Sequence, residues 1–203
     1  QAPSHISALM SGVMLKMALY GFLRVLLSML PPIPAVWALP VIGLGLFSAI
    51  FGVLYAVIER DFKRLLAYSS IENLGLMFTM IGTAIYARAS GLDALADAAL
   101  AAAVLHAIAH TIFKSGLFMG AGAIVSQLHT RDIEKMGGLA QRMPKFSGAM
   151  LVLSLGAAAM PPLDAFMSEW LFLQNIIGAI KIASPFEQGL LILVLSGIAF
   201  VGG

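Results

Sequence analysis

The chain has 203 residues, of which 60% are hydrophobic and 11% are charged, and its formal charge is +2. A soluble domain carries about 25% charged residues, so we predict an integral membrane protein that has the lipid bilayer as its surroundings. The absence of cysteine excludes disulfides, thiolate metal sites and thiol catalysis. The few basic residues are clustered, and this pattern suits membrane topology better than nucleic-acid binding.

Apolar segments of the length that a transmembrane helix needs follow one another along the chain. We therefore predict an all-α fold, a polytopic transmembrane helix bundle of about six spans. The chain starts without an initiator methionine and stops inside an apolar run. We expect residues 1–203 to be a single transmembrane domain and a fragment of a longer subunit. The expected spans are 6–30, 36–58, 65–86, 94–126, 146–180 and one that starts near residue 189.

The fifth segment, 146–180, is interrupted by Pro161-Pro162. Proline lacks an amide donor and clashes with the preceding turn, so we predict a broken helix at this point. Such breaks are tolerated at membrane depth where protein or a water-filled cavity receives the freed backbone groups, and they often mark ion or substrate sites.

Basic residues predict which loops face the cytoplasm. Loops 59–64 and 127–145 hold three and four Lys or Arg residues, whereas the loops of the other side hold only Arg88 and Lys181, with Arg24 nearby. By the positive-inside rule, 59–64 and 127–145 are cytoplasmic. The alternation requires 146–180 to cross only once, which agrees with a broken helix.

The fourth span carries His106, His110 and Lys114 at steps of four residues. On an α-helix these side chains share one face and form a polar stripe about 12 Å long. Ionisable groups at membrane depth are costly and usually mark ion or proton routes. Histidine can pass a proton between its ring nitrogens, so we favour a proton relay. Polar groups that only join helices are an alternative, and a metal site would be opposed by the adjacent lysine.

Lys16, Glu72 and Glu169 also fall within predicted spans. Together with Lys114, four such charges would cost roughly 10–14 kcal/mol unless paired or hydrated. Simpler interpretations are a snorkelling Lys16, a Glu72 at the membrane surface, and a Glu169 that caps the half-helix after the break. We predict instead a proton path. Its residues are Lys16, Glu72, His106, His110, Lys114 and Glu169.

Four stretches carry a family resemblance. They are ISALMSGVMLKMALYGFLR at 6–24, DFKRLLAYSSIENLG at 61–75, HAIAHTIFKSGLFMGAG at 106–122, and the run from TRDIEKMGGLAQRMP at 130–144 into PPLDAFMSEW at 161–170. In this order they resemble the antiporter-like membrane subunits shared by respiratory complex I, group 4 NiFe hydrogenases and Mrp-type cation/proton antiporters. The resemblance implies that Lys16 is the lysine after a first broken helix, Lys114 the central linking lysine, and Glu169 the terminal residue on the second broken helix.

One variant narrows the resemblance. Complex I members usually have Ser-His where this chain has Ile71-Glu72-Asn73, and this variant, with SEW at 168–170, is similar to the large membrane subunit of hydrogenase-4 and formate hydrogenlyase. The resemblance implies a proton-translocating subunit in a bacterial or archaeal inner membrane. Its partners would be other membrane subunits and a peripheral redox arm, either a NiFe hydrogenase or complex I-like.

The sequence contains no cysteine cluster and no dinucleotide-binding glycine motif. We therefore expect no cofactor in this chain, no catalytic residue of its own and no redox step, so any oxidoreductase activity would belong to the complex. Two other functions stay open at this point. One is an Mrp-type cation/proton antiporter that is not coupled to redox chemistry, and the other is a passive structural membrane subunit.

Overall fold

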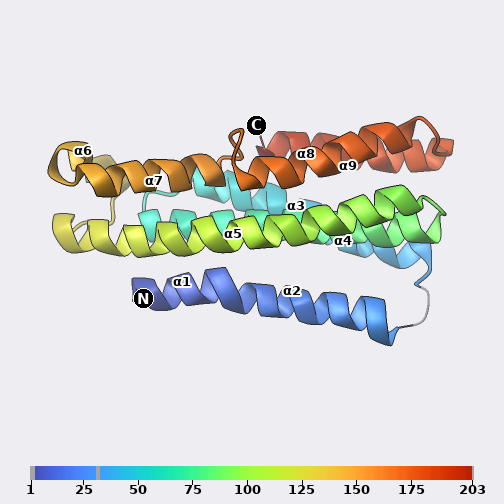
Figure 1. The fold of residues 1–203 in the computed structure, drawn as a ribbon, viewed down its shortest axis with the longest axis horizontal. Coiled ribbons are helices and arrows are strands. Elements are labelled where there is room, and N and C mark those ends of the chain that lie inside the picture. Colours follow the sequence, from blue (N-terminus) through green and yellow to red (C-terminus); the bar gives the residue numbers. More distant parts are fainter. Residues whose placement is uncertain (1–2, 31–32, 203) are drawn as a thin grey trace.

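Long helices that run side by side make up the protein (Figure 1). The computed structural model describes residues 3–30 and 33–202. Within a bilayer a helix satisfies its own backbone groups, which explains why apolar segments take this form. The first helices are α1 (Ser4–Leu9), η1 (Met10–Met14), α2 (Leu15–Arg24), η2 (Val25–Met29), η3 (Ala35–Trp37), α3 (Ala38–Ile58) and α4 (Phe62–Ala89). They are followed by α5 (Asp93–Leu128), η4 (Ile133–Lys135), α6 (Leu139–Arg142), α7 (Pro144–Ala157), α8 (Asp164–Ile180) and α9 (Pro185–Gly202).

All six predicted spans are helical, and the predicted all-α membrane bundle is confirmed. Among the described residues, three helices are long and apolar enough to cross a membrane: Ser4–Arg24, Ala35–Ile58 and Asp93–Leu128. Shorter apolar helices cover Ala165–Ile180 and Pro185–Val201. The helix α4 is not among these candidates, and it packs against both α3 and α5. Four polar residues of α4 are buried within the bundle: Ser70, Asn73, Thr79 and Thr83.

The helix α4 begins earlier than predicted, at Phe62 rather than at residue 65. Asp61 caps this end, because its carboxylate accepts hydrogen bonds from the backbone N–H groups of Lys63 (2.9 Å) and Arg64 (3.2 Å). These donors lack partners within the helix, so a side-chain cap extends the helix by the length of its first turn.

The predicted broken helix is confirmed. Helix α7 ends at Ala157 and α8 begins at Asp164, and the turn between them contains Pro161-Pro162 as a cis peptide. Figure 1 shows α7 and α8 following one another along the bundle, and both pack against α5. The segment 146–180 thus passes along the bundle once, as the alternation of basic loops requires.

The two basic loops lie at the same end of the bundle (Figure 1). Their backbones are joined by hydrogen bonds from Phe62 N to Arg131 O and from Ile133 N to Arg60 O, each 3.0 Å long. Asp61 and Asp132 form an antiparallel bridge between them. This placement confirms that 59–64 and 127–145 share one side of the membrane protein.

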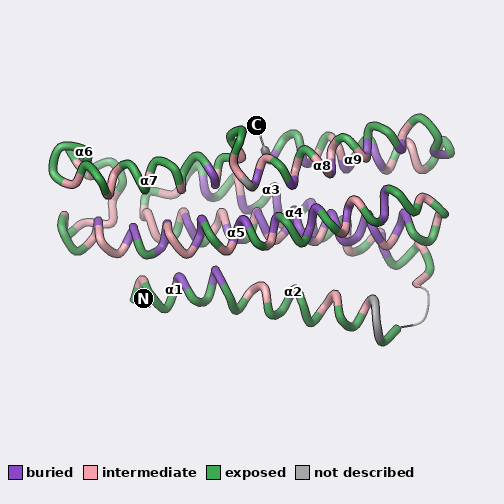
Figure 2. The backbone as a smooth tube through the Cα atoms, in the orientation of Figure 1, coloured by how far each residue is buried: buried purple, intermediate pink, exposed green. Residues whose placement is uncertain are grey.

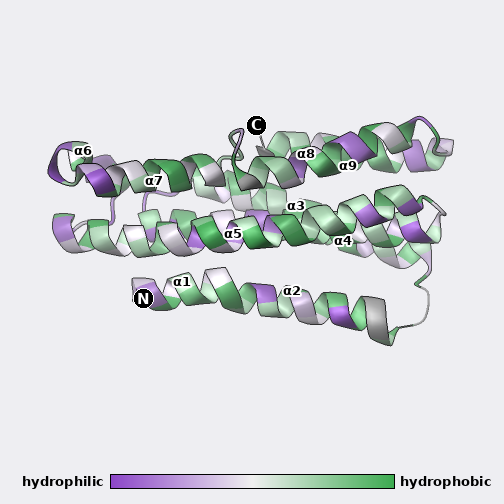
Figure 3. Cartoon of the chain, viewed as in Figure 1, coloured by the Kyte–Doolittle hydropathy of each residue, from purple (hydrophilic) through white to green (hydrophobic). Residues whose placement is uncertain are grey.

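Burial is concentrated on the helices at the centre of the bundle. Figure 2 shows that the first helical stretch is largely exposed, whereas α4 and α5 carry many buried residues. Hydrophilic residues gather mainly at the two ends of the bundle (Figure 3). Large apolar side chains such as Leu44, Phe47 and Val57 of α3 are exposed on the outside. Exposed apolar side chains on the outside of the bundle are suited to contact with the lipid tails of a bilayer.

Glycines let α3 and α4 approach each other closely. A Cβ added at Gly52 would lie 2.8 Å from Cα of Glu72, and one at Gly75 would lie 2.9 Å from Cα of Ala49. Since helices in lipid associate through close packing rather than through the hydrophobic effect, these contacts hold the pair together.

We expect Gly52→Ala to destabilise the protein by about 1–3 kcal/mol, because the backbones of α3 and α4 must move apart. Gly43→Ala is the matched control, since a Cβ there meets nothing within 4 Å. Unfolding midpoints in detergent measure both variants. Equal midpoints for the two variants would show that the close approach is unimportant.

Candidate functional site

Three polar side chains of α5 lie inside the bundle, as their spacing predicts. The exposed fractions of His106, His110 and Lys114 are 0%, 0% and 1%. Their hydrogen-bond partners lie on three other helices: α4 and α8 for His106, α2 for His110, and α4 for Lys114. The polar stripe of α5 therefore joins α5 to α2, α4 and α8.

His106 is held through both of its ring nitrogens. Its Nε2 lies 3.0 Å from Oδ1 of Asn73 on α4, and its Nδ1 lies 2.9 Å from Oγ of Ser168 on α8. The amide nitrogen of Asn73 donates to the carbonyl of Ser69 (2.7 Å), so its Oδ1 faces the imidazole. An amide oxygen only accepts, and therefore Nε2 of His106 carries a proton.

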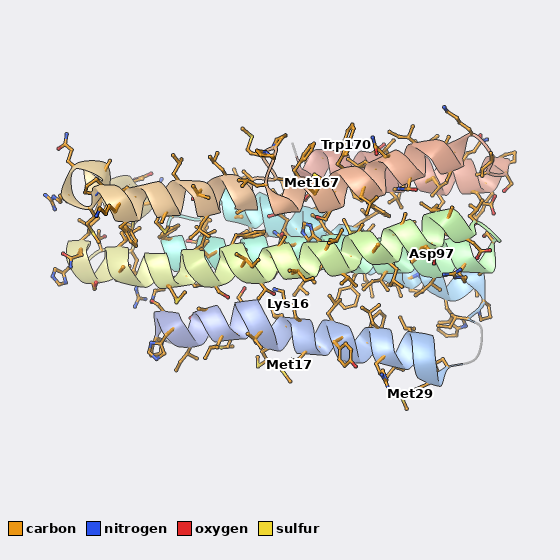
Figure 4. The ribbon with its side chains drawn as sticks, viewed as in Figure 1. Lys16, Met17, Met29, Asp97, Met167 and Trp170 are labelled. Atoms are coloured by element: carbon orange, nitrogen blue, oxygen red, sulfur yellow. The ribbon has the colours of Figure 1, made fainter. Side chains whose placement is uncertain are left out.

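Lys16 meets His110 across the interface between α2 and α5. The Nζ of Lys16 is hydrogen-bonded to Nδ1 of His110, and it also donates to the carbonyl of Ser11 at 2.7 Å. Figure 4 shows Lys16 on the side of its helix that faces α5, whereas Met17 points away. The sequence placed both residues on the predicted path but did not predict their direct contact.

The other ring nitrogen of His110 is unusual. Its Nε2 is buried and has no hydrogen-bond partner among the described residues. A lysine ammonium donates to Nδ1, so the neutral ring carries its proton on this unpartnered Nε2. An unsatisfied buried donor costs about 1–3 kcal/mol. The imidazole is thus placed to accept a proton on one side and to release one on the other.

Lys114 is bound by neutral groups of α4. Its Nζ is hydrogen-bonded to Oγ of Ser69 and donates to the carbonyl of Leu66 at 3.3 Å. Within the described part of the chain, Lys114 makes no ion pair. Because its hydrogen-bond partners are a hydroxyl and a carbonyl, Lys114 can lose its proton without breaking an ion pair with a carboxylate.

The two carboxylates of the predicted proton path, Glu72 and Glu169, are less buried than the three polar residues of α5. Glu72 and Glu169 are half-buried, and across residues 3–30 and 33–202 neither carboxylate forms an ion pair. The backbone of Glu72 packs on Gly52 of α3. Glu169 directly follows Ser168, the α8 residue that reaches His106. Their roles on a proton path stay predictions.

The neutral partners Ser69, Asn73 and Ser168 were not among the predicted site residues. Helix periodicity could have identified Ser69 and Asn73, because these two residues are one turn apart on α4 and so share a face. For Ser168 the sequence offers no comparable signal, since its contact depends on how α8 continues after the break.

A π-helical segment, η1, lies beside Lys16. Within it, the hydroxyl of Ser11 lies 2.7 Å from that of Ser70, and the carbonyl of Gly12 accepts from Thr111 Oγ1 at 3.0 Å. A π segment turns carbonyls away from regular helical bonding and is frequent at functional sites. Here it lets the carbonyl of Ser11 bind the side chain of Lys16.

Across the described residues, no group of three or more His, Cys, Asp or Glu side chains could hold a metal ion. The HxxxH pair of α5 binds Asn73, Ser168 and Lys16 instead.

The apolar helices with buried lysine and histidine side chains place the chain among the polytopic membrane proteins, in which buried ionisable groups and broken helices often mark ion or substrate sites. Residues 1–184 match the family described as NADH:quinone oxidoreductase/Mrp antiporter, TM, and the chain belongs to this family. The resemblance stated from the sequence is thereby confirmed.

Two curated relatives illustrate the match. The chain is 42% identical over 207 aligned positions to hydrogenase-4 component B of Escherichia coli (strain K12), covering 98% of this chain and 31% of that protein. It is 39% identical over 175 positions to formate hydrogenlyase subunit 3 of the same organism, covering 86% and 28%. The chain spans about a third of the length of these relatives. They bear out the similarity inferred from Ile71-Glu72-Asn73 and from 168–170.

A solved structure shares the fold. It is the structure of the membrane-bound sulfane sulfur reductase (MBS), an archaeal respiratory membrane complex. The TM-score is 0.75 at 23% sequence identity, and the match covers 98% of this chain and 38% of that chain.

We expect a double-mutant cycle of Asn73→Ala and His106→Ala to give a coupling energy of about 0.6–1.7 kcal/mol, because each variant removes the same buried hydrogen bond. The pair Asn73→Ala and His110→Ala is the control, since no hydrogen bond joins these residues. Unfolding free energies in detergent supply the cycles. Equal coupling in both pairs would contradict the role of Asn73 as partner of His106.

Proposed function

We propose that this chain is the proton-translocating part of a membrane subunit in a hydrogenase-4 or complex I-like oxidoreductase. Residues 1–203 form one transmembrane domain in this proposal. The support comes from the family, whose description names both an oxidoreductase and an antiporter, and from relatives named for hydrogenase-4 and formate hydrogenlyase. The redox reaction belongs to a peripheral arm, either a NiFe hydrogenase or complex I-like, that assembles with this and other membrane subunits.

The contact between Lys16 and His110 carries this proposal. A protonated Lys16 donates toward Nδ1 of His110, so the proton can move along this hydrogen bond. The imidazolium then has a second proton on Nε2, which is buried and unpartnered among the described residues. Release from Nε2 returns a neutral ring, and the net result is the passage of one proton through His110.

The remaining residues of the proposed path extend this step in both directions. They are Glu72, His106, Lys114 and Glu169. Two unit charges 4 Å apart interact by about 4 kcal/mol at an effective dielectric constant of 20. A redox event that changes the charge of one residue thus alters the proton affinity of its neighbours, and protons move without any redox cofactor in this chain.

For the location we propose the inner membrane of a bacterium or archaeon, with loops 59–64 and 127–145 in the cytoplasm. Membership of a transmembrane family and the apolar helices support the membrane. The shared end of the two loops and their excess of basic residues support the orientation.

We expect Lys16→Arg to abolish redox-driven proton translocation by the full-length subunit in its assembled complex. Arginine keeps the positive charge and the donors but does not release a proton in proteins. Lys16→Met should have the same effect, and Lys181→Met, in an exposed turn, should have none. Proton uptake into proteoliposomes during turnover of the redox arm is the measurement.

Normal translocation by both Lys16 variants would contradict the relay and favour a passive structural subunit. Proton movement that follows a sodium gradient, and that ignores turnover of the redox arm, would instead indicate an Mrp-type antiporter.

Orientation can be tested with single cysteines, because the chain has none of its own. We expect Lys135→Cys to react with a membrane-impermeant thiol reagent only in inside-out vesicles, and Lys181→Cys only in intact cells with the outer membrane permeabilised. Both side chains are exposed. The segment before α6, which carries Lys135, and the turn between α8 and α9, which carries Lys181, lie at opposite ends of the bundle (Figure 1). The reverse pattern would show that the basic loops are periplasmic or extracellular.

A further inference from the structure

We propose that Ser168 is a positioning residue whose hydroxyl changes acceptor with the charge of His106, so that this charge is communicated to the first turn of α8. The inference rests on the proposed function and adds to it a neutral residue that connects the buried histidine to the broken helix.

The hydroxyl of Ser168 lies between two acceptors. Its Oγ is 2.9 Å from Nδ1 of His106 and 2.8 Å from the carbonyl oxygen of Ala165. A serine hydroxyl has one proton, so it cannot donate to both at once. The exposed fractions of Ser168 and His106 are both 0%. Bulk water therefore cannot bind the acceptor that the hydroxyl of Ser168 leaves.

When His106 is neutral, its proton is on Nε2, because Asn73 offers only an acceptor there. Its Nδ1 is then an unprotonated acceptor. Ser168 donates to it, and the carbonyl of Ala165 loses the hydroxyl. This is the only arrangement in which Nδ1 of the neutral ring is satisfied by Ser168.

When His106 is protonated, both ring nitrogens are donors. Nε2 still donates to Asn73, whereas Nδ1 now donates to Oγ of Ser168. The hydroxyl proton must turn to the carbonyl of Ala165, and all the short contacts observed around Ser168 are then satisfied together. One proton on the ring thus rotates one hydroxyl.

The carbonyl that receives the hydroxyl belongs to the start of α8. In an α-helix the carbonyl of residue 165 also accepts from the N–H of residue 169, which is Glu169. The charge of His106 therefore changes the hydrogen bonding of the turn that carries this carboxylate. Ala165 is buried and is the second residue of α8, three positions after Pro162 of the break.

The helices around His106 also carry charged and titratable groups. They are Lys16 on α2, Glu72 on α4, His110 and Lys114 on α5, and Glu169 on α8. Among the described residues none of them hydrogen-bonds to His106, whose ring is bound by Asn73 and Ser168 alone. Their influence on His106 is thus electrostatic, and Ser168 supplies the connection through hydrogen bonds.

The test uses the full-length subunit in its assembled complex, with histidine labelled by ¹⁵N. We expect the unprotonated Nδ1 of His106 to show the shift of a hydrogen-bonded acceptor in the wild type, and to lose it in Ser168→Ala. Proton translocation should fall about fivefold, since one buried hydrogen bond of about 1 kcal/mol is lost. Ser168→Thr keeps a hydroxyl and should restore both properties, while Ser154→Ala, at an exposed position of α7, should change neither.

An Nδ1 resonance that is the same in the wild type and in Ser168→Ala would overturn the inference. A changed resonance with unchanged translocation would also overturn it, because the hydroxyl would then have no part in transport. If the wild-type complex moves no protons, the proposed function fails. The switch is then tested separately by lowering the pH until His106 is protonated: its Nδ1 resonance should change to that of a donor, and a resonance that keeps the acceptor shift would overturn the inference.

Discussion

The bundle depends on the need to satisfy polar side chains of α5 where bulk water cannot reach them. His106, His110 and Lys114 are almost completely buried, and each of them finds its partner on another helix. A buried polar group without a partner costs about 1–3 kcal/mol, which exceeds the roughly 1 kcal/mol by which a typical hydrogen bond stabilises a protein. The positions of α2, α4 and α8 around α5 are therefore tied to these contacts as well as to apolar packing.

The partners that hold the buried basic side chains are mostly neutral. Lys114 is bound by a hydroxyl and a carbonyl, and His106 is bound by an amide and a hydroxyl, whereas Glu72 and Glu169 stay half-buried. A carboxylate beside each cation would form a buried ion pair and fix its charge. Neutral partners satisfy the hydrogen bonds and leave the protonation free to change.

Much of the fold could be predicted from the sequence because hydropathy and proline act locally. The spans, the break at Pro161-Pro162 and the burial of the α5 stripe follow from such local signals. The contact of Lys16 with His110 and that of Ser168 with His106 could not be predicted, since they join residues far apart in the chain. The π segment η1 was missed for a similar reason, because its altered bonding is coupled to contacts with other helices.

The link between the two basic loops affects which residues can be substituted there and how far α4 and α5 can move relative to each other. The side chains of Arg60 and Glu134 add an exposed ion pair of 3.3 Å to it. Its two backbone hydrogen bonds, from Phe62 to Arg131 and from Ile133 to Arg60, do not depend on side chains, so they can persist when these residues are exchanged. It also ties the start of α4 to the segment that follows α5, and relative sliding of these helices would have to break it. If the chain transports protons as proposed, rearrangement would therefore be favoured away from this end, near the break between α7 and α8 in the middle of the bundle.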